Sequence, residues 1–268
     1  MPNKDNAQLL NKCITSITTR STYKNIEIII VENNSRQNST FELYNKLSSN
    51  KNIKIVERHG EFNYSKGNNF GVSFSNGELL LFLNNDTEVI TPAWLNEMTS
   101  YFLRKEVGIV GAKLYFGDGL IQHAGDIIGV GGVAGHSHSR FHKDASGYFD
   151  RLKVVQNLSA VTGACLMTSR SVFDEVSGFD EAYPLAFSDV DYCLKVRQKN
   201  YLIIFTPNAE LYHYESITRG HENTKEKQER FLKEVNLFRE KWKEILAIGD
   251  PYYSSNLTLD KEDFSIRL

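Results

Sequence analysis

The stretch Leu79-Leu-Leu-Phe-Leu-Asn-Asn-Asp-Thr-Glu88 decides the fold, because a continuous apolar run ends directly in an Asn-Asn-Asp turn. Such a short run is typical of a strand that is covered on both faces of its sheet. Ligands of open α/β sheets bind at the carboxyl ends of the strands, which is where Asp86 stands. A carboxylate there can hold Mg²⁺ or Mn²⁺ against the phosphates of a substrate. An ordinary strand followed by a polar turn and a helix cap explains this segment alone equally well.

Helices and strands alternate on both sides of this stretch. Strand and helix in alternation predict an α/β fold with a doubly wound, mostly parallel sheet. We expect helices over residues 9–17, 40–47, 65–75, 92–102, 170–176 and 189–198. We expect strands over residues 27–31, 53–57, 79–83, 107–110, 160–168, 202–205 and 211–214.

The rest of the chain has a different texture. Residues 117–150 are rich in Gly, His and Ser, and we interpret them as long loops over a binding face. Near the end, one apolar stripe predicts a long charged helix that docks on the body, with Phe231, Val235, Phe238, Trp242 and Leu246 on its inner face. Because there is no repeat or low-complexity linker, we expect a single domain over residues 1–268. Within it, residues 1–115 form one half, 116–221 a second, and 222–268 a terminal helix and tail.

Composition excludes several classes of protein. The formal charge is −2, from 31 basic and 33 acidic residues, and there is no basic stripe, so we expect no nucleic-acid partner. The three cysteines are widely spaced without a Cys-x-x-Cys pair, which is typical of reduced thiols. The polar N-terminus lacks the apolar core of a signal peptide, and no apolar run has the length of a membrane-spanning helix. We therefore expect a cytoplasmic protein, at most peripheral to the inner face of a membrane.

Two further patterns are weaker than they look. Residues 129–134 fit the Gly-x-Gly-x-x-Ala dinucleotide fingerprint with Asp150 at a suitable distance, but that fingerprint must open a helix and no helical apolar face follows. His136, His138 and His142 lie in a Ser-rich segment without Cys or nearby acids, which makes a weak zinc ligand set. We expect a solvated or substrate-facing loop there.

Carboxylates at the start of the predicted helix 189–198 are candidates for acid–base chemistry. Asp189 and Asp191 lie where the helix dipole favours an ionised side chain, so either is a candidate general base or simply a helix cap. His213 ends a predicted strand. A lone His there is more often structural, but a neutral imidazole could complete an octahedral metal site with Asp86 and diphosphate oxygens.

A series of motifs that covers nearly the whole chain in order resembles the family-2 glycosyltransferases of the GT-A fold. The match is closest to the bacterial rhamnosyltransferase-like branch, which makes O-antigen and other cell-surface polysaccharides. The segments that carry it are 27–35, 62–65 with Asn68-Asn69, 83–89, 122–125, 162–165, 178–181, 189–193 and 250–253. The resemblance implies an inverting transfer of a sugar from a nucleotide-diphospho-sugar to a hydroxyl of a glycan or lipid-linked acceptor, with Mn²⁺ or Mg²⁺ as cofactor.

The resemblance also implies roles for individual residues. Asp86 and His213 would contact the metal, while Asp189, with Asp191 as its neighbour, would supply the catalytic base. Donor contacts would come from the positions that match the family's nucleotide and sugar pocket, namely Glu32, Asn34, Asn68, Asn85 and Gly163.

Three departures from the family pattern bear on these roles. Asn84-Asn85-Asp86 retains one carboxylate where many members have more, which predicts weak metal binding. Ser188 replaces the usual Glu before Asp189, so the choice between Asp189 and Asp191 stays open. Residues 2–5 resemble the segment that follows the family's first strand, so we expect that strand to be missing. A truncated transferase, self-association or fusion to further transferase domains would account for such a chain. A catalytically weak nucleotide-sugar or glycan-binding module is the alternative function.

Overall fold

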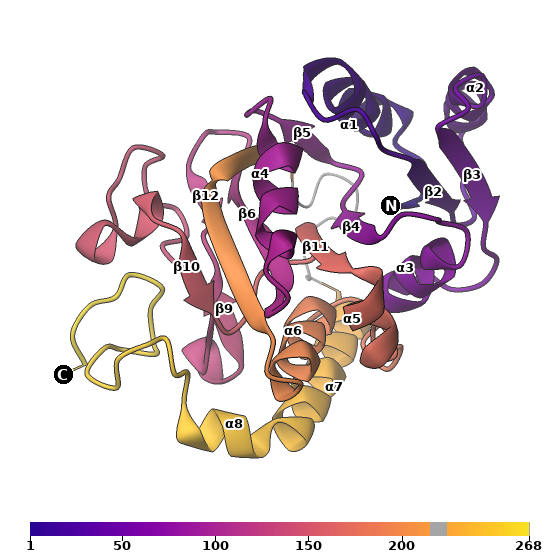
Figure 1. Ribbon diagram of the computed structural model, residues 1–268. Helices are drawn as coiled ribbons and strands as arrows, with labels where there is room; N and C mark the ends of the chain where they lie inside the picture. The colour runs from indigo at the N-terminus through magenta and orange to yellow at the C-terminus, as the bar shows by residue number, and fades with distance from the viewer. Residues whose placement is uncertain (215–223, 268) are drawn as a thin grey trace.

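The computed structural model describes residues 1–214 and 224–267, and it forms an α/β structure with two principal sheets (Figure 1). The smaller sheet is parallel throughout, in the order β1-β2-β3. Its strands are β1 (Pro2–Asn3), β2 (Ile28–Glu32) and β3 (Ile53–Glu57). The helices that accompany them are α1 (Ala7–Arg20), α2 (Asn38–Leu47) and α3 (Tyr64–Val72).

The larger, seven-stranded sheet has the order β10-β12-β6-β11-β4, with β5 on β12 and β7 on β6. Its strands are β4 (Leu79–Leu83), β5 (Thr87–Val89), β6 (Val107–Tyr115), β7 (Ile121–His123), β10 (Gln156–Leu158), β11 (Cys165–Ser169) and β12 (Leu202–His213). Among these pairs only β6 and β12 run parallel. The expected α/β class is confirmed, but a mostly parallel sheet is wrong, because β11 runs back antiparallel between β4 and β6.

The expectation that the first strand is missing is also wrong in part. Pro2 and Asn3 form a short strand that pairs in parallel with Val31 and Glu32 of β2. The ladder includes Met1, whose carbonyl accepts the Val31 N–H at 2.9 Å. Two residues, one of them proline, carry no periodic pattern by which a strand could be predicted from sequence.

Helices cover both faces of the larger sheet, and β4 shows why its sequence is apolar throughout. Leu80 and Phe82 point into the core beneath α5 (Arg170–Glu175), α6 (Ser188–Gln198) and α7 (Lys225–Lys241). Leu81 and Leu83 point to the opposite core, beside α1 and α4 (Trp94–Ser100). Alternate side chains of one strand therefore fill two separate cores, as its continuous apolar run predicts.

Other elements differ from expectation in their bounds. The two strands expected over 202–214 are one strand, β12, with an irregularity between Thr206 and Glu210. The segment expected as loop contains β7 and the hairpin of β8 (Asp126–Ile128) and β9 (Ala134–His136). The terminal helix is divided at Trp242 into α7 and α8 (Lys243–Ile248). Short 3-10 turns lie at Tyr101–Leu103, Val130–Gly132 and Tyr148–Lys153.

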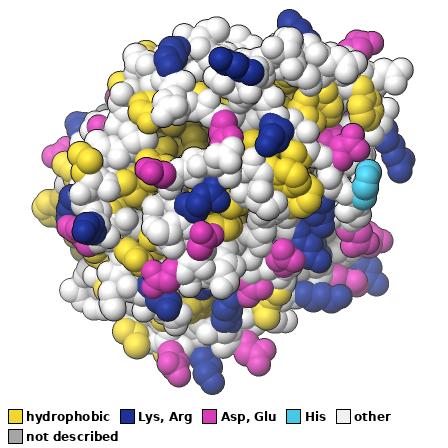
Figure 2. Space-filling view, turned by 45° about the vertical axis from the view of Figure 1, so that its right-hand side comes forward, with side chains coloured by type: hydrophobic (Ala, Val, Ile, Leu, Met, Phe, Trp, Pro, Cys, Tyr) yellow, Lys and Arg dark blue, Asp and Glu magenta, His cyan; other side chains and the backbone are white. Residues whose placement is uncertain are grey.

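The second of these turns lies in the Gly-rich segment, so the dinucleotide fingerprint opens no α-helix, as expected. The expected boundary at residues 221 and 222 falls outside the described residues. In the part of the chain that the structure describes, no helix has both the length and the apolar character needed to cross a bilayer. Basic and acidic side chains are interspersed over the face shown in Figure 2.

Candidate active site

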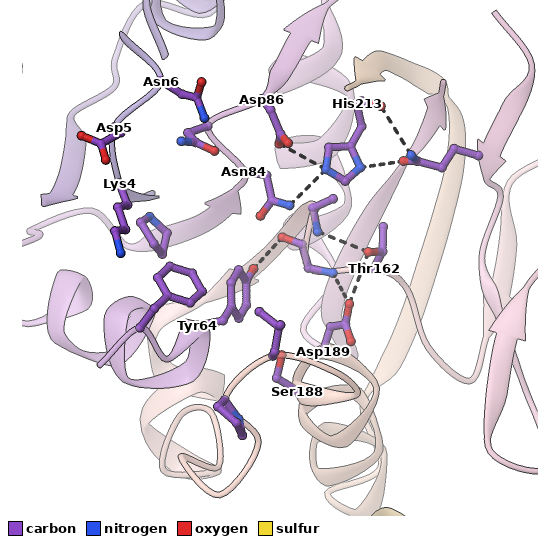
Figure 3. A pocket seen from close by; sticks show the side chains of 18 of the residues that line it. Lys4, Asp5, Asn6, Tyr64, Asn84, Asp86, Thr162, Ser188, Asp189 and His213 are labelled. Atoms are coloured by element: carbon purple, nitrogen blue, oxygen red, sulfur yellow. Dashed lines mark hydrogen bonds and ion pairs between the residues drawn. The ribbon is translucent and has the colours of Figure 1, made fainter. Parts of the chain in front are cut away.

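A cavity of about 590 Å³ lies where the carboxyl ends of β4 and β12 meet the start of α6. Its walls come from segments far apart in sequence, as Figure 3 shows. Asp86 and His213 occupy one side, Ser188 and Asp189 another, and Tyr64 lies between them. The strand-end position that the sequence predicts for Asp86 therefore opens into a pocket.

Asp86 and His213 form a close pair of nearly buried side chains. The His213 Nε2 atom lies 3.2 Å from Asp86 Oδ1 and 3.1 Å from Asn84 Nδ2, and His213 Nδ1 lies 2.6 Å from Gln122 Oε1. Because the Gln122 oxygen can only accept, His213 Nδ1 donates to it. The other ring nitrogen, Nε2, faces both the Asp86 carboxylate and the Asn84 amide.

This pair fits a divalent cation. A carboxylate oxygen and an imidazole nitrogen are both ligands that divalent cations accept, so together they can hold one shared ion. Neighbouring ligands of one octahedral ion stand roughly 3 Å apart when each metal–ligand distance is about 2.1 Å. The 3.2 Å separation in this structure is compatible with that spacing. Asn84 and Asn85 line the same wall and offer only neutral oxygens.

Asp189 stands in the first turn of α6, with its carboxylate held by backbone and hydroxyl donors. Its Oδ2 atom accepts the Gly163 N–H at 2.7 Å and the Thr162 hydroxyl at 3.3 Å, while Oδ1 accepts the Val190 N–H at 2.9 Å. Burial and the nearby Asp126 raise the pKa of Asp189, although these N–H groups and His136 oppose the rise. A carboxylate with a raised pKa that faces a cavity is suited to proton transfer.

Gly163 is required by close packing. A Cβ atom at this position would lie 2.7 Å from the Tyr64 hydroxyl oxygen and 3.3 Å from the Asp189 Cβ. The Tyr64 hydroxyl donates to the Gly163 carbonyl at 2.7 Å, so Gly163 contacts the Asp189 carboxylate through its N–H and the tyrosine through its carbonyl. Gly163 lines the cavity together with Asn85, whose amide donates to Asn3 Oδ1.

Four of the residues predicted from sequence are not among those that line this cavity. The Asp191 carboxylate is buried on the other side of α6, where it accepts from Trp242 Nε1 at 2.9 Å and pairs with Lys241 at 2.7 Å. Asn34 donates to the Gly60 carbonyl, and Asn68 donates to the Tyr64 carbonyl. Glu32 is buried and accepts from Ser35 and Tyr44. The geometry gives these four side chains structural contacts.

Glu32 nevertheless orders the opposite wall of the cavity. The Ser35 hydroxyl that donates to Glu32 also accepts the Asp5 N–H at 2.7 Å. Asp5 Oδ1 in turn accepts the N–H groups of Arg36 and Gln37 just before α2. Through Ser35 and Asp5, Glu32 therefore helps to hold the cavity wall that Asp5 lines, although Glu32 itself does not line the cavity.

Sequence analysis missed several side chains that line the cavity, among them Lys4, Asp5, Tyr64, Thr162 and Arg230. Tyr64 and Thr162 stand within motifs that carry the family resemblance, which was the available signal. Lys4 and Asp5 follow β1, a strand too short to predict from its pattern. The family resemblance, which places residues 2–5 just after the first strand, was the available signal for them.

Three further residues, His123, Asp126 and His136, gather beside Asp189, and we call them the histidine cluster. Asp126 Oδ1 lies 2.6 Å from His136 Nδ1 and 3.6 Å from His123 Nδ1. His123 Nε2 accepts the N–H groups of Gly125 and Thr162, each at 3.2 Å. To bind a metal through Nδ1, the His123 ring would have to carry its proton on Nε2. A protonated Nε2 could not accept the N–H groups of Gly125 and Thr162, so these two hydrogen bonds oppose metal binding through Nδ1. The cluster is therefore a hydrogen-bonded group and a poor metal site.

Comparisons with known proteins show the family and the fold. Residues 1–177 match the family described as Glycosyl transferase family 2. The chain belongs to that family. It is 46% identical over 266 residues to the uncharacterized protein y4gI of Sinorhizobium fredii (strain NBRC 101917 / NGR234), covering 98% of this chain and 29% of that protein. It is 36% identical over 268 residues to the O-antigen biosynthesis protein RfbC of Myxococcus xanthus, covering 100% of this chain and 20% of that protein.

The chain thus spans less than a third of the length of these curated relatives. Among solved structures, it is similar to the mannosyltransferase PcManGT from Pyrobaculum calidifontis, solved in complex with GDP-Man and Mn²⁺. That match has a TM-score of 0.62 with 13% identity, and it covers 92% of this chain and 66% of the other. At this identity the likeness shows the fold, which is the GT-A-type α/β fold that the sequence predicts.

Proposed function

We propose that this domain transfers a sugar from a nucleotide-diphospho-sugar donor to a hydroxyl of a glycan or lipid-linked saccharide, with inversion at the anomeric carbon. The observation that carries the proposal is the shared cavity, which Asp189 faces from α6 and the Asp86–His213 pair faces from two strand ends. Membership of the family and the similarity to an O-antigen biosynthesis protein support a role in bacterial surface polysaccharide synthesis.

Asp189 is the proposed general base. Its carboxylate takes the proton of the acceptor hydroxyl while that oxygen forms a bond to the anomeric carbon. The bond between that carbon and the nucleoside diphosphate breaks on the opposite face, and the diphosphate leaves with the bonding electrons, so the configuration inverts. The hydrogen bonds from Gly163 and Thr162 fix the carboxylate in place, which limits the entropy lost on reaching the transition state.

Asp86 and His213 are the proposed ligands of a divalent cation, Mn²⁺ or Mg²⁺. When bound, such an ion would offset the negative charge of the leaving diphosphate. Their place on the cavity wall and their 3.2 Å spacing support this role. Because Asp86 is the only carboxylate among Asn84, Asn85 and Asp86, we expect the ion to bind weakly without donor and more tightly with donor phosphates present.

The test is a transfer and donor-hydrolysis assay with Mn²⁺ over a panel of nucleotide-diphospho-sugars, together with donor binding by calorimetry. We expect turnover in the wild-type chain and a fall of roughly 100-fold or more in Asp189→Asn, with donor affinity little changed. Asp174→Asn is the matched control, because that carboxylate is exposed on α5. Saturable donor binding without turnover in any reaction would instead support the binding-module alternative.

A further inference from the structure

The histidine cluster lies behind the catalytic wall, and the proposed mechanism leaves it unused. Asp126 and His136 face each other across the β8–β9 hairpin, and His123 comes from β7. Asp126 and His123 are almost fully buried, whereas the His136 side chain is 40% exposed and lines the cavity. A carboxylate so deeply buried requires a compensating positive charge or several hydrogen bonds.

The hydrogen bonds assign a charge to each member. The His123 ring is neutral with its proton on Nδ1, because its Nε2 accepts two backbone N–H groups. The His136 Nδ1 lies 2.6 Å from Asp126 Oδ1 and 3.1 Å from His123 Nδ1, and a proton on His136 Nδ1 makes the first of these contacts a hydrogen bond to the carboxylate. Burial alone would lower the pKa of His136, but Asp126 raises it to about 9, so the ring is an imidazolium at neutral pH. Burial would raise the pKa of Asp126, but the two imidazoles hold it well below its usual value.

The cluster reaches Asp189 in two ways. His123 Nε2 accepts the Thr162 N–H, and the Thr162 hydroxyl and the next N–H along the chain both donate to Asp189. Through space, the negative charge of Asp126 raises the pKa of Asp189, while the positive charge of His136 lowers it. The two charges of the cluster therefore act on the base in opposite directions.

We propose that the histidine cluster is a positioning unit for the Asp189 base: its imidazolium neutralises the buried Asp126 carboxylate, and its neutral imidazole holds the backbone that binds Asp189. The inference rests on the proposed function, since it assigns Asp189 the role of base. It gives His136, a residue of a segment expected as a substrate-facing loop, a defined electrostatic role. Without the imidazolium, an uncompensated carboxylate beside Asp189 would favour its protonated, inactive form.

Titratable groups from several elements face this unit and enter any test by pH. Those around Asp189 are Asp126, His123, His136, Tyr64 on α3 and Cys193 on its own helix. Those around His136 are Asp126, His123, Asp189 and Glu262, whose carboxylate accepts the His136 backbone N–H at 3.0 Å. The variants below remove the charge of His136 alone or the charges of His136 and Asp126 together, and leave the other groups in place.

The first experiment follows the acid limb of the pH–rate profile for donor turnover with Mn²⁺. His136→Asn keeps a hydrogen-bond donor near the Nδ1 position but removes the positive charge, so we expect the acid limb of the profile to move to higher pH. The rate at pH 6 should be roughly tenfold lower than that of wild type, while the rate on the high-pH plateau should stay within about threefold of wild type. Asp126→Asn with His136→Asn removes both charges and should return the limb toward its wild-type position. His142→Gln, an exposed histidine of the same segment, is the control.

The second experiment does not require activity. Carboxyl and imidazole NMR titrations of the full chain report Asp189 and His136 directly, and we expect His136 to titrate near pH 9 and the Asp189 midpoint to rise in His136→Asn. A His136 midpoint at or below about 6.5, or an Asp189 midpoint unmoved by His136→Asn, would overturn the inference. Shifts as expected in a chain without turnover would refute the proposed function and leave the electrostatic coupling standing.

Discussion

The two carboxylates at the start of α6 should separate cleanly when each is replaced by asparagine. Asp189 lines the cavity, while Asp191 is fully buried and bound to Lys241 and Trp242. Asp191→Asn therefore removes a buried charge partner without touching the cavity. We expect it to reduce stability and to leave the turnover of the folded protein within about threefold of wild type.

The expected loss of stability in Asp191→Asn depends on which contacts Trp242 and Lys241 retain. The asparagine oxygen can still accept from Trp242 Nε1, so that hydrogen bond is weakened but not orphaned. Lys241 loses one of two carboxylates and keeps Asp180, which lies 2.7 Å from its Nζ. Complete loss of a buried pair costs about 3–5 kcal/mol, and retention of the second partner should reduce this to about 1–3 kcal/mol.

Urea unfolding of Asp189→Asn, Asp191→Asn and wild type, with turnover measured on the same preparations, checks this. Asp189→Asn should lose roughly 100-fold or more in turnover, and its unfolding midpoint should fall modestly, because the amide nitrogen must face one of the backbone N–H groups that the carboxylate accepts. A stable Asp191→Asn protein with the larger loss of turnover would refute the assignment of the base and the argument from burial together.

Three other changes have defined outcomes. Asp86→Ala should abolish the Mn²⁺ dependence of donor affinity in calorimetry without unfolding the chain, and unchanged Mn²⁺-dependent affinity would exclude this residue as a ligand. Gly163→Ala should lower turnover by roughly tenfold or more and affect donor affinity less, since the added methyl group would displace Tyr64 or Asp189. Full turnover in this variant would show that the cavity wall can accommodate the methyl group without displacing either residue. Burial lowers the pKa of His138 to about 4, so the unfolded chain takes up a proton at this residue at a higher pH than the folded chain does. The free energy of unfolding, measured in urea, should therefore fall by up to ~3 kcal/mol as the pH drops from about 6.5 through 4. His138→Gln should flatten this pH dependence, and a variant with the wild-type pH dependence would contradict the argument.

Local sequence predicts the strand-end half of the site well. Apolar and polar residues do not alternate in the run that leads to Asp86, because both faces of β4 are covered. The absence of alternation can be seen in the sequence alone. The direction of β11 is not visible in that way, because its apolar residues would suit a parallel or an antiparallel neighbour equally. Pairing between β11, β4 and β6 depends on how the whole chain returns to the sheet.

Helical geometry could have separated Asp189 from Asp191. Residues two apart on an α-helix project roughly 200° apart, so only one of them can face a given cavity. The sequence did not say which, because the partners of Asp191, Lys241 at the end of α7 and Trp242 just after it, are some 50 residues away in the chain. Long-range packing of this kind, like that of His123 and His136, appears only in the folded structure.

The segment that joins the two halves of the site is 162–164, between β10 and β11. The carbonyl of Ala164 accepts the Asn84 N–H at 3.1 Å at the strand end that carries Asp86, while the N–H of Gly163 donates to Asp189 on α6. Three consecutive residues thus fix the spacing between the proposed cation ligands and the proposed base through backbone atoms. Backbone hydrogen bonds do not depend on side-chain identity, so the spacing between the proposed cation ligands and the proposed base should tolerate substitutions in the surrounding pocket. It should not tolerate a side chain at Gly163, where the cavity wall has no room for a Cβ atom.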